Sequence, residues 1–188
     1  MIPGTPMSIG SATKILRDRV TTKAGQLAGA TLPTLVVIAS LHDGAYLLLR
    51  PDEAVNFLTS DWAYTIPVES NGNDTYLSTD LKYSIFFKPD PQFPSKIAPC
   101  RQSISAVLLM PISGDRLNVT GVLHPEPIYP FSINFLKNVP FARVQKWPIE
   151  NGEIFTEWVI SDPYASVFHH LNHIKRNITN LDIEKNST

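Results

Sequence analysis

The sequence predicts an α+β fold: a central antiparallel sheet of about six strands, with amphipathic helices near the N- and C-termini packed on one face. Short apolar runs separated by Gly, Asp or Asn recur along the chain and are typical of strands joined by hairpins. The two end segments instead repeat apolar residues at three- and four-residue spacing, which is typical of helices. No internal repeat or linker divides the 188 residues, so we expect a single domain with flexible ends at 1–10 and 185–188.

The first predicted element is a helix that begins near Ser11, a good capping residue, and runs to about residue 28. Gly29 is a plausible stop. Its apolar residues form one stripe: Ala12, Ile15, Leu16, Val20, Ala24 and Leu27.

A hairpin of residues 35–40 and 45–50 is predicted next, because Asp43-Gly44 is a strong turn signal between apolar runs. Residues 52–60 then suggest a short helix with Val55, Phe57 and Leu58 pointing inward.

Residues 61–100 are the least regular part of the chain, because several prolines forbid a long element there. Only 81–88 suggests a short strand. A long irregular stretch in a compact domain is often a binding loop. Its aromatic rings and one guanidinium could line a pocket for an anionic small molecule, which gives the candidate ligand-binding residues Trp62, Tyr64, Tyr83, Phe87 and Arg101. The alternative is that these aromatics belong to the core and Arg101 lies at a strand edge.

Residues 103–125 are expected to form the centre of the sheet. Two runs rich in Val, Ile and Leu, 104–112 and 117–123, flank Ser113-Gly114-Asp115-Arg116, which favours a tight reversal.

After this hairpin, a short helix capped by Ser132 is predicted for residues 131–139. A further hairpin is predicted from two apolar runs, 141–147 and 154–160, on either side of Asn151-Gly152. Asp162 and Pro163 are suited to the cap and first position of a final helix that reaches about residue 181.

Composition excludes several functional classes. A net charge of −1 without a Lys/Arg cluster argues against nucleic-acid binding. The single cysteine, Cys100, excludes an internal disulfide and a cysteine-based zinc site. No signal peptide or membrane span is evident, so a cytoplasmic location is expected, and four Asn-x-Ser/Thr triplets, at Asn73, Asn118, Asn177 and Asn186, are taken as accidental.

Residues 90–131 resemble part of a GAF domain, a sensory fold related to PAS. The matching motifs are Asp90-Pro91-Gln92-Phe93, the run SAVLLMPI at 105–112, VTGVL at 119–123 and Pro130-Phe131. With the helix and strands before them, the resemblance covers about residues 11–131. It implies a domain that binds a small molecule between sheet and loops, often as a homodimer through its terminal helices. The cysteine and sequence patterns of the family's better-known ligand classes are absent, so no ligand or cofactor is implied.

Other chemistry has weaker support in the sequence. His169 and His173 lie four apart on the predicted final helix, a spacing that can hold zinc, but two further ligands are needed and a solvated helix face is the alternative. We therefore expect no metal site. Cys100 with a histidine could form a nucleophilic pair, or it could be a small, partly buried core residue.

The function expected from the sequence is a small-molecule-binding sensory or regulatory domain without catalytic activity. The alternative is a structural or protein-interaction protein that uses its sheet or helix face, and a hydrolase using the histidines is a third hypothesis.

Overall fold

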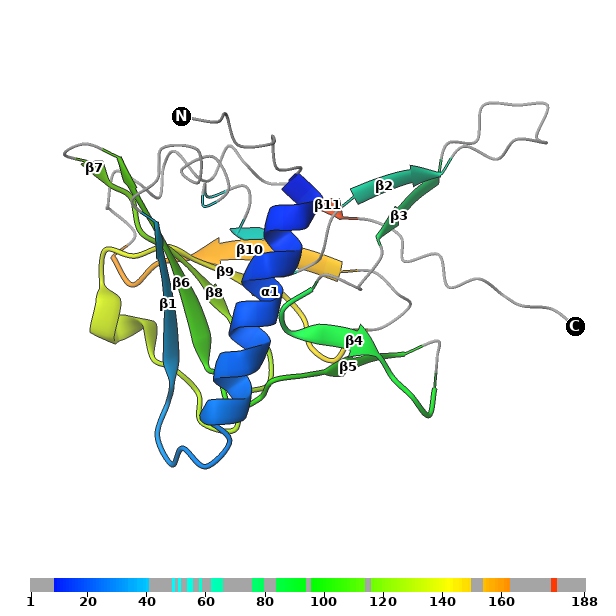
Figure 1. Cartoon of the computed structure of the whole chain (residues 1–188), viewed down its shortest axis with the longest axis horizontal. Coiled ribbons are helices and arrows are strands. Elements are labelled where there is room, and N and C mark those ends of the chain that lie inside the picture. The colour runs from blue at the N-terminus through cyan, green and yellow to red at the C-terminus, as the bar shows by residue number, and fades with distance from the viewer. Residues whose placement is uncertain are drawn as a thin grey trace, which may run out of the picture.

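The structure of the chain is a computed structural model, which describes residues 9–40, 49, 51, 54–55, 58, 62–65, 76–79, 84–93, 96–113, 116–149, 154–162 and 177–178. Its main sheet has the strand order β1-β6-β8-β9-β10-β11, with β7 paired to β6 (Figure 1). These strands are β1 (Leu35–Ser40), β6 (Ala106–Ser113), β7 (Arg116–Leu117), β8 (Thr120–Leu123), β9 (Phe141–Val144), β10 (Ile154–Val159) and β11 (Asn177–Ile178). Two small sheets pair β2 (Trp62–Thr65) with β3 (Tyr76–Thr79), and β4 (Phe87–Pro89) with β5 (Ile97–Pro99).

The predicted central hairpin is confirmed. β6 pairs antiparallel with β8, with Leu109 opposite Thr120, and with β7, with Ile112 opposite Leu117. The chain therefore reverses between residues 113 and 116, where Gly and Asp were expected to turn it. β6 lies between β1 and β8, so its side chains are buried on both faces, which explains why it reads as a continuous apolar run.

The prediction of an antiparallel sheet is wrong, because the main sheet is mixed. β1 runs parallel to β6, with Leu35 beside Ala106, and β8 runs parallel to β9, with Gly121 beside Phe141. Parallel neighbours need a long crossover, which residues 41–105 and 124–140 provide. A hairpin of residues 35–40 with 45–50 is not found: the described partner of β1 is β6. Of the predicted second strand, Leu49 lies in a helical turn, and residues 41–48 lie outside the described part.

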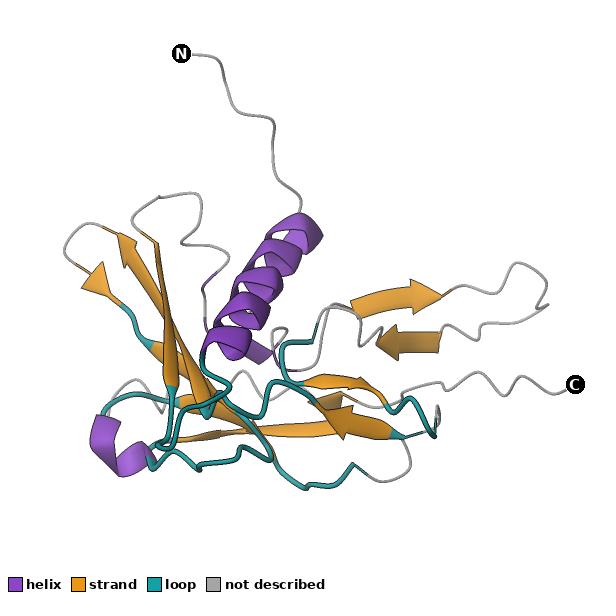
Figure 2. Cartoon of the chain, turned by 60° about the horizontal axis from the view of Figure 1, so that its bottom comes forward, coloured by secondary structure: helices purple, strands orange, loops and turns teal. Residues whose placement is uncertain are grey.

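Helix α1 (Ile9–Gln26) packs on one face of the sheet (Figure 2). It begins before Ser11, so that residue is inside the helix and not its cap. Val20 and Ala24 join a core with Val107, Leu109 and other inward-facing residues of the sheet. Positions 51, 54, 55 and 58 are helical, and Val55 and Leu58 are buried as predicted; Phe57 is outside the described residues.

Residues 131–139 cover the opposite face, where they pack around Phe141, Leu108 and Ala106. The expected helix is only a 3₁₀ turn, η3 (Ile133–Leu136), and the Ser132 side chain makes no cap bond. The following hairpin is confirmed, because β9 and β10 pair antiparallel with Phe141 opposite Val159.

The predicted C-terminal helix is corrected at its far end. Residues 177–178 form strand β11, in which Ile178 lies opposite Ile154 of β10. The predicted pair of terminal helices is therefore wrong at its C-terminal member, because positions 177–178 belong to the sheet; residues 163–176 lie outside the described part. The short strand expected at 81–88 is shifted to β4. Within the described ranges, no helix combines the length and apolar character needed to cross a membrane.

Candidate functional site

A groove of about 440 Å³ lies between α1 and β1. We call it the α1–β1 groove. Residues 35–39 of β1 form one wall; α1 contributes Leu16, Arg19, Val20 and Lys23 to the other, and Leu27 follows directly after the helix. Successive side chains of a strand point to opposite faces, so five consecutive lining residues mean that the groove follows the edge of β1. Its volume falls in the range of ligand-binding pockets.

The outer backbone edge of β1 faces this groove. Thr34 O accepts hydrogen bonds from the N–H groups of Ser105 (2.9 Å) and Ala106 (3.3 Å), so residue 34 directs its backbone toward β6. Successive residues of a strand direct their backbone N–H and C=O groups to opposite sides. The backbone groups of Val36 and Ile38 therefore point toward β6, and those of Leu35, Val37 and Ala39 point outward. Within the part of the chain that the structure describes, β6 alone pairs with β1.

The rim of the groove is positively charged. Helix α1 carries Lys14, Arg17, Arg19 and Lys23 but only one acidic residue, Asp18, whose carboxylate is paired with Arg17 at 2.9 Å. Arg19 and Lys23 form no ion pair with a carboxylate of the described residues, and Lys23 Nζ donates to Gln26 Oε1 at 2.9 Å. The α1–β1 groove is therefore a largely apolar channel with the cations Arg19 and Lys23 on one side.

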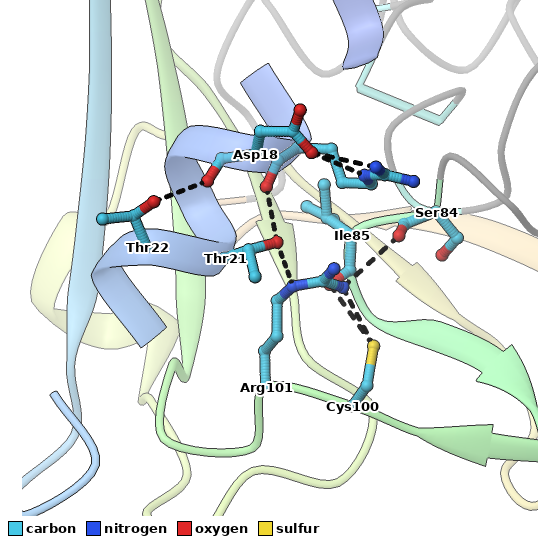
Figure 3. A network of polar contacts seen from close by, with 8 residues as sticks. Asp18, Thr21, Thr22, Ser84, Ile85, Cys100 and Arg101 are labelled. Carbon is cyan, nitrogen blue, oxygen red and sulfur yellow. Dashed lines mark hydrogen bonds and ion pairs between the residues drawn. The ribbon is translucent and has the colours of Figure 1, made fainter. Parts of the chain in front are cut away.

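A second cluster of polar contacts surrounds Arg101, whose φ of 62° is in the left-handed region (Figure 3). Its Nε donates to Thr21 Oγ1 of α1 at 2.8 Å. Its Nη1 donates to Ile85 O at 2.6 Å and to Cys100 Sγ at 3.0 Å. The guanidinium thus joins α1 to the segments around residues 85 and 100, which is a structural role.

Cys100 and His124 are neighbours, but not as a nucleophile and its base. His124 Nε2 donates to the carbonyl oxygen of Cys100 at 2.9 Å, and Nδ1 accepts from the Glu126 N–H at 3.0 Å. Burial lowers the pKa of His124 to about 4 and raises the pKa of the Cys100 thiol, against the nearby charge of Arg101. Both ring nitrogens are engaged with the backbone, so neither faces Cys100 Sγ as a base would.

The predicted ligand-binding residues are found in different surroundings. Phe87 is only 1% exposed and stacks on Trp147, with ring centroids 5.5 Å apart. Arg101 makes the contacts above. Neither residue lines the α1–β1 groove. Trp62 and Tyr64 lie in β2, but their side chains, like Tyr83, are outside the described part, so ligand binding by these five residues stays a prediction.

Sequence reasoning missed the α1–β1 groove. A readable signal was the pair Arg19 and Lys23, four apart beside the apolar stripe of α1. No three His, Cys, Asp or Glu residues among those described gather to hold a metal ion, and His169 and His173 lie outside them.

No protein-family model, curated protein or solved structure matches this chain. The resemblance to GAF domains therefore stays a prediction.

Proposed function

We propose that the chain is a non-catalytic binding module that holds a segment of another protein in the α1–β1 groove. This is the interaction function that the sequence left open. The observation that carries it is the course of the groove along the outer edge of β1, to which no other described strand pairs, beside the exposed side chain of Val37. An apolar groove next to the outward backbone groups of a sheet edge suits an extended peptide better than a compact molecule.

A small anionic molecule is the second candidate ligand. The groove volume and the two rim cations favour it, and it corresponds to the small-molecule sensory function that the GAF resemblance implies. A homodimer through the terminal helices and a cytoplasmic location remain predictions of the sequence.

The two candidates can be separated by selecting peptides from a random library on the wild-type chain and screening small anions by thermal shift. We expect selected peptides to lose binding to Val37→Arg and to retain it with Phe135→Arg. Val37 lines the groove and is 50% exposed, whereas Phe135 is 79% exposed in η3 and lies away from it. Failure to select any peptide, or equal binding to Val37→Arg and the wild type, would contradict the proposal; a thermal shift with small anions alone would favour the second candidate.

A further inference from the structure

We infer that the partner segment binds as an added β-strand on β1, with acidic residues at the positions that face α1. This inference rests on the proposed function and specifies the partner's chemistry and its mode of binding.

The backbone of β1 provides the first part of the argument. Leu35, Val37 and Ala39 each direct an N–H and a C=O outward, so the edge offers alternating donors and acceptors to an incoming strand. Natural edge strands are commonly protected by Lys, Pro or a bulge. None of the residues 35–40 is Lys or Pro, and the pairing of β1 with β6 is in unbroken register. Within the described part of the chain, this edge therefore carries none of these protections against an added strand.

The side chains around the edge determine which strand fits. Residues of an added strand beside Val36 and Ile38 would share their face of the sheet, on which α1 lies. There they meet the rim cations Arg19 and Lys23. The alternate residues would lie beside Leu35 and Val37 on the other face, where half of the Val37 side chain is exposed. The partner segment is therefore expected to alternate acidic and apolar residues.

The same charges disfavour a second copy of this chain as the occupant. Antiparallel pairing of two β1 strands about a twofold axis normal to the sheet places both α1 helices on the same face. The Arg19 and Lys23 side chains of both copies would then approach one strand junction, and like charges repel.

The test uses short synthetic peptides that alternate valine and glutamate, and counterparts in which glutamine or lysine replaces glutamate. Binding to the full chain is measured by fluorescence anisotropy at low and high salt. We expect the glutamate peptide to bind about tenfold tighter than the glutamine peptide, and the lysine peptide to bind weakest. Two sets of peptides are N-methylated, one at the odd and one at the even positions. Only every second residue of an added strand directs its N–H toward β1, so one set should lose binding and the other should keep it.

Matched variants of the chain test the two parts separately. Val37→Pro removes an outward N–H without touching a bond to β6, so the fold should persist while peptide affinity falls about tenfold; Val37→Ala, which keeps the N–H, should fall less. Arg19→Glu with Lys23→Glu should reverse the preference toward the lysine peptide. Lys14→Glu, a change on an exposed position outside the groove, should not.

The outcomes are distinguishable. If no peptide of any charge binds, the proposed function fails. If peptides bind but are indifferent to N-methylation and to Val37→Pro, or if the glutamate and lysine peptides bind alike, the proposed function survives and this inference is overturned. Tight self-association of the wild type that Val37→Pro abolishes would identify a second copy as the occupant, and would also overturn it.

Discussion

Gly121 of β8 lies directly against the ring of Phe141 in the neighbouring strand β9. A Cβ atom on Gly121 would collide with Cδ1 and Cε1 of Phe141, whose ring is fully buried. The two residues are also register partners in the parallel β8–β9 pair. The absence of a side chain at 121 therefore leaves room for the ring of Phe141, around which residues 131–139 pack on this face of the sheet.

Gly121→Ala should destabilise the chain by about 1–3 kcal/mol, the usual cost of overpacking a core. Chemical denaturation gives the free energy of unfolding. The matched control is Gly25→Ala, because Gly25 is an exposed position of α1 with open space around it. That change should raise the stability by about 0.5–1 kcal/mol, since alanine is the better helix former. Equal effects of the two substitutions would contradict the role assigned to Gly121.

Arg101 should be the rare position at which glycine is better tolerated than alanine. Both Arg101→Ala and Arg101→Gly remove the contacts to Thr21, Ile85 and Cys100, but only glycine relieves the positive φ of 62°. We expect Arg101→Gly to be about 1 kcal/mol more stable than Arg101→Ala in thermal or urea unfolding, with both below the wild type. An alanine variant as stable as the glycine variant would mean that the backbone is not strained there.

The thiol of Cys100 should titrate at a higher pH in the native chain than in the unfolded chain. Burial raises its pKa, and the charge of Arg101 opposes that shift without cancelling it. Because Cys100 is the only cysteine, the pH dependence of its alkylation rate by iodoacetamide reports this group alone. The midpoint measured in buffer should exceed the midpoint in urea. A native midpoint at or below the unfolded one would mark Cys100 as an activated thiol and contradict the structural role described here.

Local features of this fold were predictable from the sequence. The turn signals Gly114-Asp115 and Asn151-Gly152 are local, because each consists of neighbouring residues between two apolar runs. The strands on either side of each signal pair antiparallel, β6 with β8 and β9 with β10, as expected for hairpins. The apolar spacing of α1 likewise predicts the face that carries Val20 and Ala24 into the core.

Long-range pairing was not predictable. Val36 pairs with Val107 across a segment of the chain that carries no periodic signal for a parallel partner, while Asp43-Gly44 favoured a local hairpin. At the C-terminus, Ile178 fits an apolar helical stripe and also fits a strand opposite Ile154; tertiary context selects the strand. The α1–β1 groove exists because β1 is the first strand of the sheet order, which is a result of long-range pairing. The cations Arg19 and Lys23 were therefore visible in the sequence, but the outward backbone groups of β1 were not.

His124 should make the chain less stable as the pH falls below about 6.5, the ordinary pKa of histidine. Its pKa in the folded chain is lowered to about 4 by burial, so the unfolded chain takes up a proton between these two values and the folded chain does not. The geometry gives the reason: in the neutral ring Nδ1 accepts from the Glu126 N–H, and a proton there would oppose that donor.

The stability contributed by neutral His124 is therefore complete above pH 6.5 and is lost as the pH falls toward 4, by about 2 kcal/mol at pH 5. Urea unfolding at pH 7 and pH 5 measures the difference for the wild type and for His124→Gln, which cannot titrate in this range. The loss on going to pH 5 should be larger in the wild type by about that amount. The same pH dependence in both proteins would show that His124 is protonated in the native chain or that carboxylates alone account for the effect.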